Sequence, residues 1–424
     1  MISVRVSRGQ LLALLWTIGL ALAACGGGTA STTSSLPSSS TTSTVAPAIT
    51  STTPPSTTPP ATSASTTSAL PATTLAPNTT AAPTTTKAAT PGTATLAFVG
   101  DVIGLIPNIE RARQNAGGEG YDFRPMFDRV RPLISAADYA ICHFEVPVKP
   151  EGQGWTPRYV TPGELVTAVA DAGFDRCSLA SNHALDRGAK GIDATAAAFD
   201  AIGLGRSGTA VSEADAVPDL VEVNGIRIAH LSYTYATPGH EMPRGEPWRV
   251  NLINRKQIQR DIKTVRAAGA HYVVVSLHFG KTMITAPDDF QKKTVRWLWS
   301  NTDVDLIVGC HAHVIQPIDH RGDRYVLYGL GNHLATYPGG PITTLKAQDG
   351  LLAFVTIRRA DDGSITTDRP SIIPTWDGRG DGSYTIYDAR DAANPEVPAD
   401  LRKQLEKSLR RTRAVVGEYL MATS

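Results

Sequence analysis

Acidic residues are missing from the first 92 positions of this 424-residue chain, which hold only three basic residues, Arg5, Arg8 and Lys87. The whole chain carries 40 Lys+Arg and 39 Asp+Glu. Positions 93–424 therefore hold 40 − 3 = 37 basic and 39 acidic side chains, a net charge of −2. A near-neutral globular part lacks the positive field that nucleic-acid binding usually requires, so we expect no nucleic-acid partner.

Cysteine is scarce as well, with only Cys25, Cys142, Cys177 and Cys310. Four cysteines are too few for a scaffold held together by disulfides, whereas a globular stretch of about 330 residues can bury a large core without them. Beyond position 93 no apolar run approaches the ~18 residues that a membrane span would need.

The first 25 residues have the pattern of a secretory signal peptide. Arg5 and Arg8 precede the apolar run 11–24, a charged region followed by a hydrophobic one. The run ends in Leu-Ala-Ala before Cys25, which resembles the bacterial lipobox, whose cysteine is acylated. We therefore expect Cys25 to anchor the protein to the bacterial cell membrane, on its extracytoplasmic side. An ordinary signal peptide with a chance cysteine, or an uncleaved anchor, are the alternatives. Lipidation would leave three other cysteines, so at least one stays unpaired.

Residues 26–92 predict a disordered linker. From position 29 they are almost entirely Thr, Ser, Pro and Ala, with no aromatic residue. Such a chain cannot bury enough apolar surface to offset its conformational entropy, and its proline content favours extended conformations. We interpret it as a stalk, of a composition that O-glycosylated stalks share, that holds a globular domain, residues 93–424, away from the membrane.

The globular domain alternates strand and helix patterns. Short apolar runs typical of strands occur at 95–99, 138–144, 174–180, 226–233, 272–277, 305–308, 325–329 and 351–357. Stretches with helical spacing occur at 164–172, 191–202, 255–268 and 288–300, and a basic helix, read as a surface element, is expected from 401 onward. This alternation predicts an α/β fold around a large sheet.

Polar side chains follow six of the predicted strands directly. They are Asp101, Glu145, Asn182 with His183, His278, His311 with His313, and Asn332 with His333. In open α/β sheets, ligands bind beyond the carboxyl ends of the strands, so these side chains are expected to share one site. An extended segment would put the imidazoles of His311 and His313 on the same side. Four other histidines, His230, His240, His271 and His320, are assigned to structural or surface roles.

Carboxylate, carboxamide and imidazole ligands suit manganese, zinc or iron. Two such ions about 4 Å apart, bridged by one carboxylate, would stabilise the attacking and leaving oxygens of a phosphoryl transfer. No thiolate is needed, and Cys310 is interpreted as a buried structural thiol because free cysteine is among the most buried residue types.

The motifs, in this order, resemble those of the CapA-type capsule or poly-γ-glutamate synthesis proteins, a branch of the calcineurin-like metallophosphoesterase superfamily. The matching segments are 98–101, 144–145, 180–186, 278–280, 309–316 and 329–332. The resemblance covers residues 93–340 and implies a four-layer α/β/β/α sandwich with a metal site at one edge. It also implies a role in the biogenesis of an envelope polymer.

The resemblance implies a role for each site residue. Asp101 and His313 would bind one metal, Asn182, His278 and His311 the second, and Glu145 would bridge them. His183 would protonate the leaving oxygen, Asp186 would orient it, and Asn332 would shape the edge of the site.

Several positions depart from this pattern, among them Cys310-His311-Ala312, which replaces the family's usual second His-Pro. His143 stands where the family has asparagine, Thr282 where it has glutamate, and His333 where it has an aromatic residue. The superfamily histidine two residues after the first aspartate is absent, because position 103 is Ile103. This absence makes the expected first metal site weaker or incomplete. His143 and His333 are accessory candidates whose imidazoles would compensate for the carboxylate lost at Thr282.

Two hypotheses follow. The first is a lipid-anchored metal-dependent phosphoesterase that acts on an envelope polymer or its phosphorylated precursor, within a polymer-synthesis complex in the membrane. The second is a catalytically inert, membrane-tethered accessory protein that binds or exports an anionic envelope polymer.

Overall fold

The computed structural model describes residues 90–153, 159–337, 344–379 and 382–422. The predicted signal peptide, Cys25 and all of the predicted linker except its last three positions lie outside the described residues. Within the described ranges, none of the helices combines the length and the apolar content that crossing a bilayer requires.

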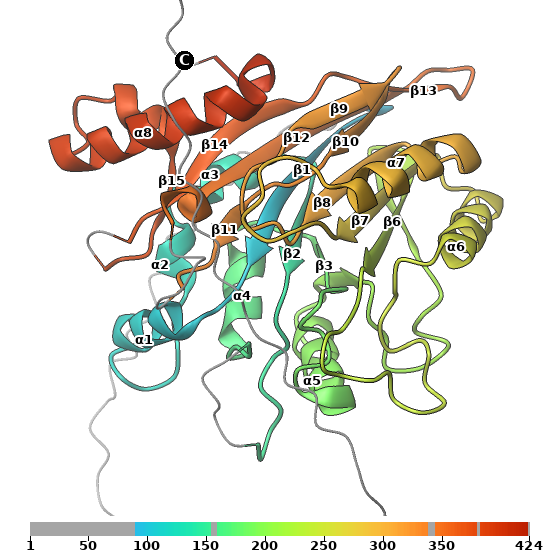
Figure 1. Cartoon of the computed structure of the whole chain (residues 1–424), viewed down its shortest axis with the longest axis horizontal. Helices are drawn as coiled ribbons and strands as arrows, with labels where there is room; N and C mark the ends of the chain where they lie inside the picture. Colours follow the sequence, from blue (N-terminus) through green and yellow to red (C-terminus); the bar gives the residue numbers. More distant parts are fainter. Residues whose placement is uncertain (1–89, 154–158, 338–343, 380–381, 423–424) are drawn as a thin grey trace, which may run out of the picture. The chain divides into compact units, whose positions relative to one another are not determined.

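Two sheets form the centre of the described part of the chain (Figure 1). The first runs in the order β15-β14-β12-β1-β2-β3-β4, with β11 paired to β1 and β13 to β12. Its strands are β1 (Thr93–Val102), β2 (Tyr139–Phe144), β3 (Arg176–Ser178), β4 (Gly205–Ser207), β11 (Asn332–Leu334), β12 (Asp349–Arg359), β13 (Ile365–Thr367), β14 (Ser371–Asp377) and β15 (Ile386–Asp388).

The second sheet runs in the order β5-β6-β7-β8-β10-β9. Its strands are β5 (Leu220–Val223), β6 (Ile226–Thr234), β7 (Tyr272–His278), β8 (Leu306–Cys310), β9 (Ile318–Arg321) and β10 (Arg324–Leu327). The helices are α1 (Ile106–Asn115), α2 (Arg124–Phe127), α3 (Arg131–Ile134), α4 (Glu164–Asp171), α5 (Gly188–Asp200), α6 (Arg255–Ala267), α7 (Asp289–Asn301) and α8 (Ala399–Val416).

Strand alternation sorts the buried side chains into three main layers of core. Along β1, Leu96 and Phe98 face the second sheet, whereas Ala97 and Val99 face α1 to α5. Along β7, Tyr272 and Val274 likewise face the first sheet, and the alternating residues Val273 and Val275 face α6 and α7. Three packed interfaces between four layers are an α/β/β/α sandwich, which confirms the predicted fold.

All eight predicted strands and the four helices predicted between them are present, with ends that differ by a few residues. The predicted surface helix is α8, and it is more than a surface element. Its Leu405 and Val416 are buried, and Ser408 and Arg411 both hydrogen-bond the carboxylate of Asp349 in β12.

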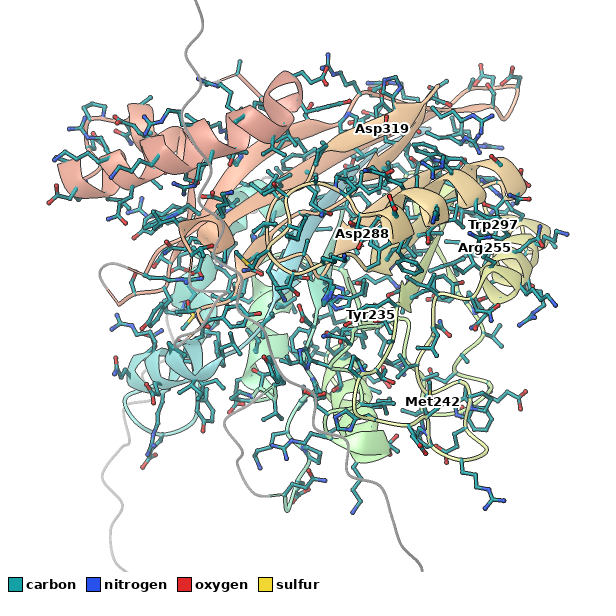
Figure 2. All side chains as sticks on the ribbon, in the orientation of Figure 1. Tyr235, Met242, Arg255, Asp288, Trp297 and Asp319 are labelled. Carbon is teal, nitrogen blue, oxygen red and sulfur yellow. A yellow bond between two sulfur atoms is a disulfide. The ribbon has the colours of Figure 1, made fainter. Side chains whose placement is uncertain are left out.

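The two helices that cover the second sheet begin at side-chain caps. Asn254 accepts from two backbone amides at the start of α6, and Asp288 forms a capping box with Gln291 at the start of α7. Figure 2 labels Asp288 and shows Arg255 beside Trp297, whose ring centroid lies 5.3 Å from the guanidinium carbon. These contacts hold in place the two helices that pack against β7 and β8.

A disulfide joins Cys142 in β2 to Cys177 in β3, residues that are also paired in the sheet. Cys310 is the unpaired cysteine among the described residues, and it is buried. The expectation of at least one unpaired cysteine is therefore met, as is the burial of Cys310. The bridge ties together two strands whose ends carry candidate site residues.

Removing this bridge in the double variant Cys142→Ala/Cys177→Ala is expected to lower the free energy of unfolding by about 3–4 kcal/mol. The bridge links residues 35 positions apart and so restricts the unfolded chain. Guanidinium unfolding followed by circular dichroism measures the change. Cys310→Ala, which loses only a buried side-chain contact, is the matched control. A double variant as stable as this control would contradict the expectation.

Candidate metal centre

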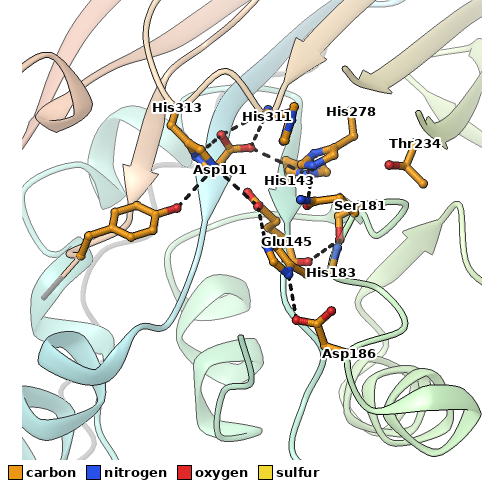
Figure 3. A network of polar contacts seen from close by, with 12 residues as sticks. Asp101, His143, Glu145, Ser181, His183, Asp186, Thr234, His278, His311 and His313 are labelled. Carbon is orange, nitrogen blue, oxygen red and sulfur yellow. Dashed lines mark hydrogen bonds and ion pairs between the residues drawn. The ribbon is translucent and has the colours of Figure 1, made fainter. Parts of the chain in front are cut away.

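The carboxyl ends of β1, β2, β7 and β8 converge on one cluster of buried polar side chains (Figure 3). Asp101 in β1 is paired with His143 in β2, and His278 in β7 is paired with Cys310 at the end of β8. Gly100 and Gly309 allow the chains to approach, because a Cβ on either would lie about 2 Å from a carbonyl oxygen. The cluster thus contains most of the residues that the strand-end pattern predicted, with His333 as the exception described below.

Glu145, just after β2, occupies the middle of the cluster. Its side chain is buried, and neither carboxylate oxygen has a hydrogen-bond partner among the described residues. Its Oε1 lies 3.7 Å from Nε2 of His313 and 3.9 Å from Nε2 of His183. Burial raises the pKa of this carboxyl well above its ordinary value of 4.5. A buried carboxylate without hydrogen bonds is costly unless a cation compensates it.

Asp101 and His313 form a buried ion pair in the cluster. Nδ1 of His313 lies 3.1 Å from Oδ2 of Asp101 and 3.0 Å from Oδ1 of Asn332. Burial alone would lower the pKa of His313, but the carboxylates of Glu145 and Asp101 outweigh it and raise that pKa to about 9. The two carboxylates thus favour positive charge at this point of the cluster.

Three other imidazoles of the cluster favour the neutral form. Burial lowers the pKa of His143 and of His311 to about 4, and it lowers that of His278 well below the ordinary value. Nε2 of His278 lies 2.9 Å from Oδ1 of Asn182, and Nδ1 of His311 is buried without a hydrogen-bond partner among the described residues. A neutral imidazole with an unengaged nitrogen, such as that of His311, is the form that binds metal ions.

These donors fit divalent metal ions. Two groups of residues each bring their ligand atoms within 4.8 Å of one another. The first group is Asp101, His143, Glu145 and His278, and the second is Glu145, His311 and His313. Glu145 is common to both, as the predicted bridging position requires. The grouping places His278 with Asp101, whereas the resemblance assigns them to different ions, so which ligand binds which ion stays a prediction.

The segment that carries His311 and His313 is not extended, unlike the sequence-based expectation. Both residues have positive φ angles, 89° and 54°. The amide of His311 also points at the carboxylate of Asp101, with both oxygens 3.3 Å away. Positive φ angles are uncommon for residues other than glycine, and such strain collects at functional sites. A tight turn, and not strand alternation, therefore brings the two imidazoles together.

His183 lies on the solvent side of Glu145 and is oriented by three neighbours. Its Nδ1 is 2.8 Å from Oδ2 of Asp186, its ring stacks on Tyr159 with centroids 3.7 Å apart, and its amide donates to Ser181. The predicted pairing of Asp186 with His183 is therefore present. His240, assigned to a structural or surface role, lies 3.4 Å from the other oxygen of Asp186.

Aromatic residues near the site were not anticipated from the sequence. The Tyr235 ring centroid lies 4.9 Å from that of His311, and the side chain is partly exposed (Figure 2). The hydroxyl of Tyr337 lies 3.3 Å from Nε2 of His313. Tyr159, Tyr235 and Tyr337 come from separate loops, and only the fold brings them to one place.

Asn332 and His333 point in opposite directions, as neighbours in a strand must. Asn332 contacts His313, and its amide donates to the carbonyl of Ala347. His333 instead packs against Phe127 and Phe174, and neither ring nitrogen has a hydrogen-bond partner among the described residues. The structure does not bring His333 into the cluster, so it supplies no compensating imidazole there.

His333→Leu is expected to reduce the acid sensitivity of the fold. Burial lowers the pKa of His333 to about 3, so between about pH 6.5 and pH 3 the unfolded chain binds a proton that the folded chain does not. The free energy of unfolding therefore falls as pH falls, by up to about 1.4 kcal/mol per pH unit for this residue.

Denaturant unfolding of the metal-free protein between pH 7 and pH 4 measures this slope. The exposed His320 provides the control variant His320→Leu, which should keep the wild-type slope. An unchanged slope in His333→Leu would show that this residue is not the acid-sensitive group.

The fold and the cluster together define a class: a four-layer α/β protein with a buried carboxylate–imidazole site for divalent metal. Comparison with known proteins identifies the family. A family described as "Bacterial capsule synthesis protein PGA_cap" matches residues 95–337, and the chain belongs to this family.

Two curated relatives share the family. The chain is 29% identical over 255 residues to the PGA biosynthesis protein CapA of Bacillus subtilis (strain 168), a match that covers 56% of this chain and 62% of the relative. It is 31% identical over 250 residues to the capsule biosynthesis protein CapA of Bacillus anthracis, covering 56% and 59%. The match thus spans about three fifths of the length of these relatives.

Solved structures with a lower likeness include two phosphoesterase-type proteins. A putative 5'-nucleotidase from Staphylococcus aureus aligns with a TM-score of 0.41 and 13% identity, over 74% of this chain and 58% of that one. The calcineurin-like phosphoesterase YfkN from Bacillus subtilis aligns with a TM-score of 0.39 and 10% identity, over 76% and 98%.

Proposed function

We propose that this protein is a lipid-anchored, metal-dependent phosphoesterase-type hydrolase of capsule or poly-γ-glutamate-type polymer biogenesis. The observation that carries the proposal is Glu145, whose buried carboxylate has no hydrogen-bond partner among the described residues and is surrounded by imidazoles. The two ligand groups that share Glu145 suit a pair of manganese, zinc or iron ions.

The residues that would hold the metals are Asp101, Glu145, Asn182, His278, His311 and His313, and Glu145 would be shared between them. Bound metals would supply Lewis-acid polarisation of a phosphoryl group. The protein itself would hold that group between the buried ligands and His183, whose side chain is partly exposed.

His183 is the proposed general acid. Asp186 accepts a hydrogen bond from Nδ1–H, which leaves Nε2 facing Glu145 and available to hand its proton to the leaving oxygen. The stacked ring of Tyr159 holds the imidazole plane. Asp186 and Tyr159 are positioning residues in this scheme.

Membership of the capsule synthesis family supports an envelope polymer, or its phosphorylated precursor, as the substrate, and a membrane-bound synthesis complex as the partner. The Cys142–Cys177 disulfide supports an extracytoplasmic location, because disulfides persist in oxidising compartments. Lipidation at Cys25 would then hold the protein at the membrane surface.

A second candidate is an inert accessory protein that binds or exports an anionic polymer, favoured by Ile103, which stands where the superfamily has a metal-binding histidine. Elemental analysis of the purified protein, combined with hydrolysis of aryl phosphate mono- and diesters in manganese, zinc and iron, separates the two. About two metals per chain with turnover supports the hydrolase. At most one metal without turnover refutes it and leaves the accessory role.

A further inference from the structure

We infer that His143 is a metal ligand of this site. The inference deepens the proposed function and rests on its metal site. It concerns a residue at which this chain departs from the family pattern, so it is specific to this protein.

The position of His143 in the first sheet directs it into the cluster. It is paired with Asp101 across β1 and β2, and its side chain is buried. Its Nε2 lies 2.8 Å from Nδ1 of His278 and 3.8 Å from Oδ1 of Asp101. It is therefore one of four residues that offer a ligand atom within 4.8 Å of one another, with Glu145 as the fourth.

The far side of the imidazole is engaged in the way that metal-binding histidines require. Nδ1 of His143 lies 2.5 Å from the hydroxyl of Ser178, its pairing partner in β3. A serine hydroxyl accepts as well as donates, so Ser178 can hold the Nδ1–H tautomer and leave the Nε2 lone pair directed at His278 and Asp101. Such outer contacts orient the ring and raise its basicity as a ligand.

The disulfide strengthens this arrangement. Cys142 and Cys177 immediately precede His143 and Ser178, so the bridge holds together the two strands from which the histidine and its serine project. The imidazole is thereby presented to the cluster with little freedom to move. Preorganisation of this kind is what a metal ligand needs.

A second buried histidine–serine pair shows what a structural role looks like in the same fold. Nε2 of His230 in β6 lies 2.8 Å from the hydroxyl of Ser276 in β7, and His230 is buried. His230 belongs to neither group of candidate ligands among the described residues. The two pairs share burial and hydrogen bonding, but only His143 faces the carboxylates, so His230 is a matched control.

The test compares the wild type with His143→Asn, which restores the family residue, with Ser178→Ala, which removes only the outer contact, and with His230→Asn. Zinc affinity is measured by chelator competition, and the visible spectrum of the cobalt-loaded protein reports the ligand set. We expect His143→Asn to weaken zinc binding about 100-fold or more and to change the cobalt spectrum. Ser178→Ala should weaken binding about 10- to 100-fold, and His230→Asn should match the wild type.

Loss of an imidazole should also shift metal preference. Imidazole favours zinc over manganese more than an amide oxygen does. The affinity ratio of zinc to manganese is therefore expected to fall in His143→Asn, which a general loss of packing would not produce.

Each outcome is decisive. A wild-type protein that holds neither zinc nor cobalt would overturn both this inference and the proposed function. Wild-type binding that His143→Asn retains in full, or that His230→Asn loses equally, would overturn the inference alone. Circular dichroism of the metal-free forms checks folding; if His143→Asn does not fold, unchanged zinc affinity in Ser178→Ala overturns the inference.

Discussion

Glu145→Gln is expected to abolish metal binding and to lower hydrolysis by about 10³-fold or more, since Lewis-acid stabilisation of the transition state amounts to several kcal/mol. Glu145 is common to both groups of candidate ligands, so one substitution should affect both ions. Glutamine keeps the shape of the side chain and removes its charge. Elemental analysis and steady-state hydrolysis measure the two losses.

The same substitution should stabilise the metal-free protein. Burial raises the pKa of Glu145 above 4.5, so the folded state binds the proton more tightly than the unfolded state. The stability that this proton provides is present at low pH and is lost as pH rises through the folded pKa. At pH 8 we expect metal-free Glu145→Gln to be more stable than the wild type by about 1–3 kcal/mol.

Asp377 provides a matched control for this prediction. It is also a buried carboxylate with a raised pKa, but it hydrogen-bonds Thr336 and lies near Arg379, outside both ligand groups. Asp377→Asn should keep the metal and the activity. Retention of two metals by Glu145→Gln would rule out the bridging role.

His183→Asn is expected to slow hydrolysis in a way that depends on the leaving group. General acid catalysis contributes about 10²- to 10⁴-fold when the leaving oxygen needs a proton. An alkyl phosphoester should therefore lose about that much activity. A 4-nitrophenyl ester, whose leaving group is stable as an anion, should lose about tenfold or less, and metal content should not change.

Asp186→Asn extends this test. Its side chain keeps the shape that contacts His183 but can no longer accept from Nδ1–H through a charged oxygen, so the imidazolium that would donate its Nε2 proton loses its counter-charge and is held less firmly. We expect an intermediate loss with the same leaving-group dependence. Equal losses for both esters, or loss of metal, would contradict the assignment of His183 as the acid.

The elements that sequence alone predicted are those with a strong local signal. β1, β7 and β12 are long apolar runs, and α6 and α7 have apolar residues at helical spacing. Several elements that were missed are strands of three residues, such as β4, β13 and β15. Three residues carry no readable period, and their pairing is decided by the neighbouring strand. The longer elements α1 and β14 were missed as well.

The candidate site divides in the same way. Asp101, Glu145 and His278 could be named because parallel strands end together and polar residues directly after them meet there. The geometry of His311 and His313 could not, because their left-handed turn depends on contacts with β1. The sequence also could not show which of His143 and His333 enters the cluster, since a one-residue difference in strand position decides which face of the sheet a side chain lies on.

The sequence by itself thus determined the α/β class, the strand-end ligands and the family resemblance, because periodicity and strand-end position are local properties of the chain. Only the tertiary structure decided that Glu145 is buried without a hydrogen-bond partner among the described residues, that Ser178 orients His143, and that the Cys142–Cys177 bridge ties β2 to β3. These contacts join residues about 35 or more positions apart, or depend on burial by distant elements. Packing of the two sheets creates them, and no local pattern encodes them.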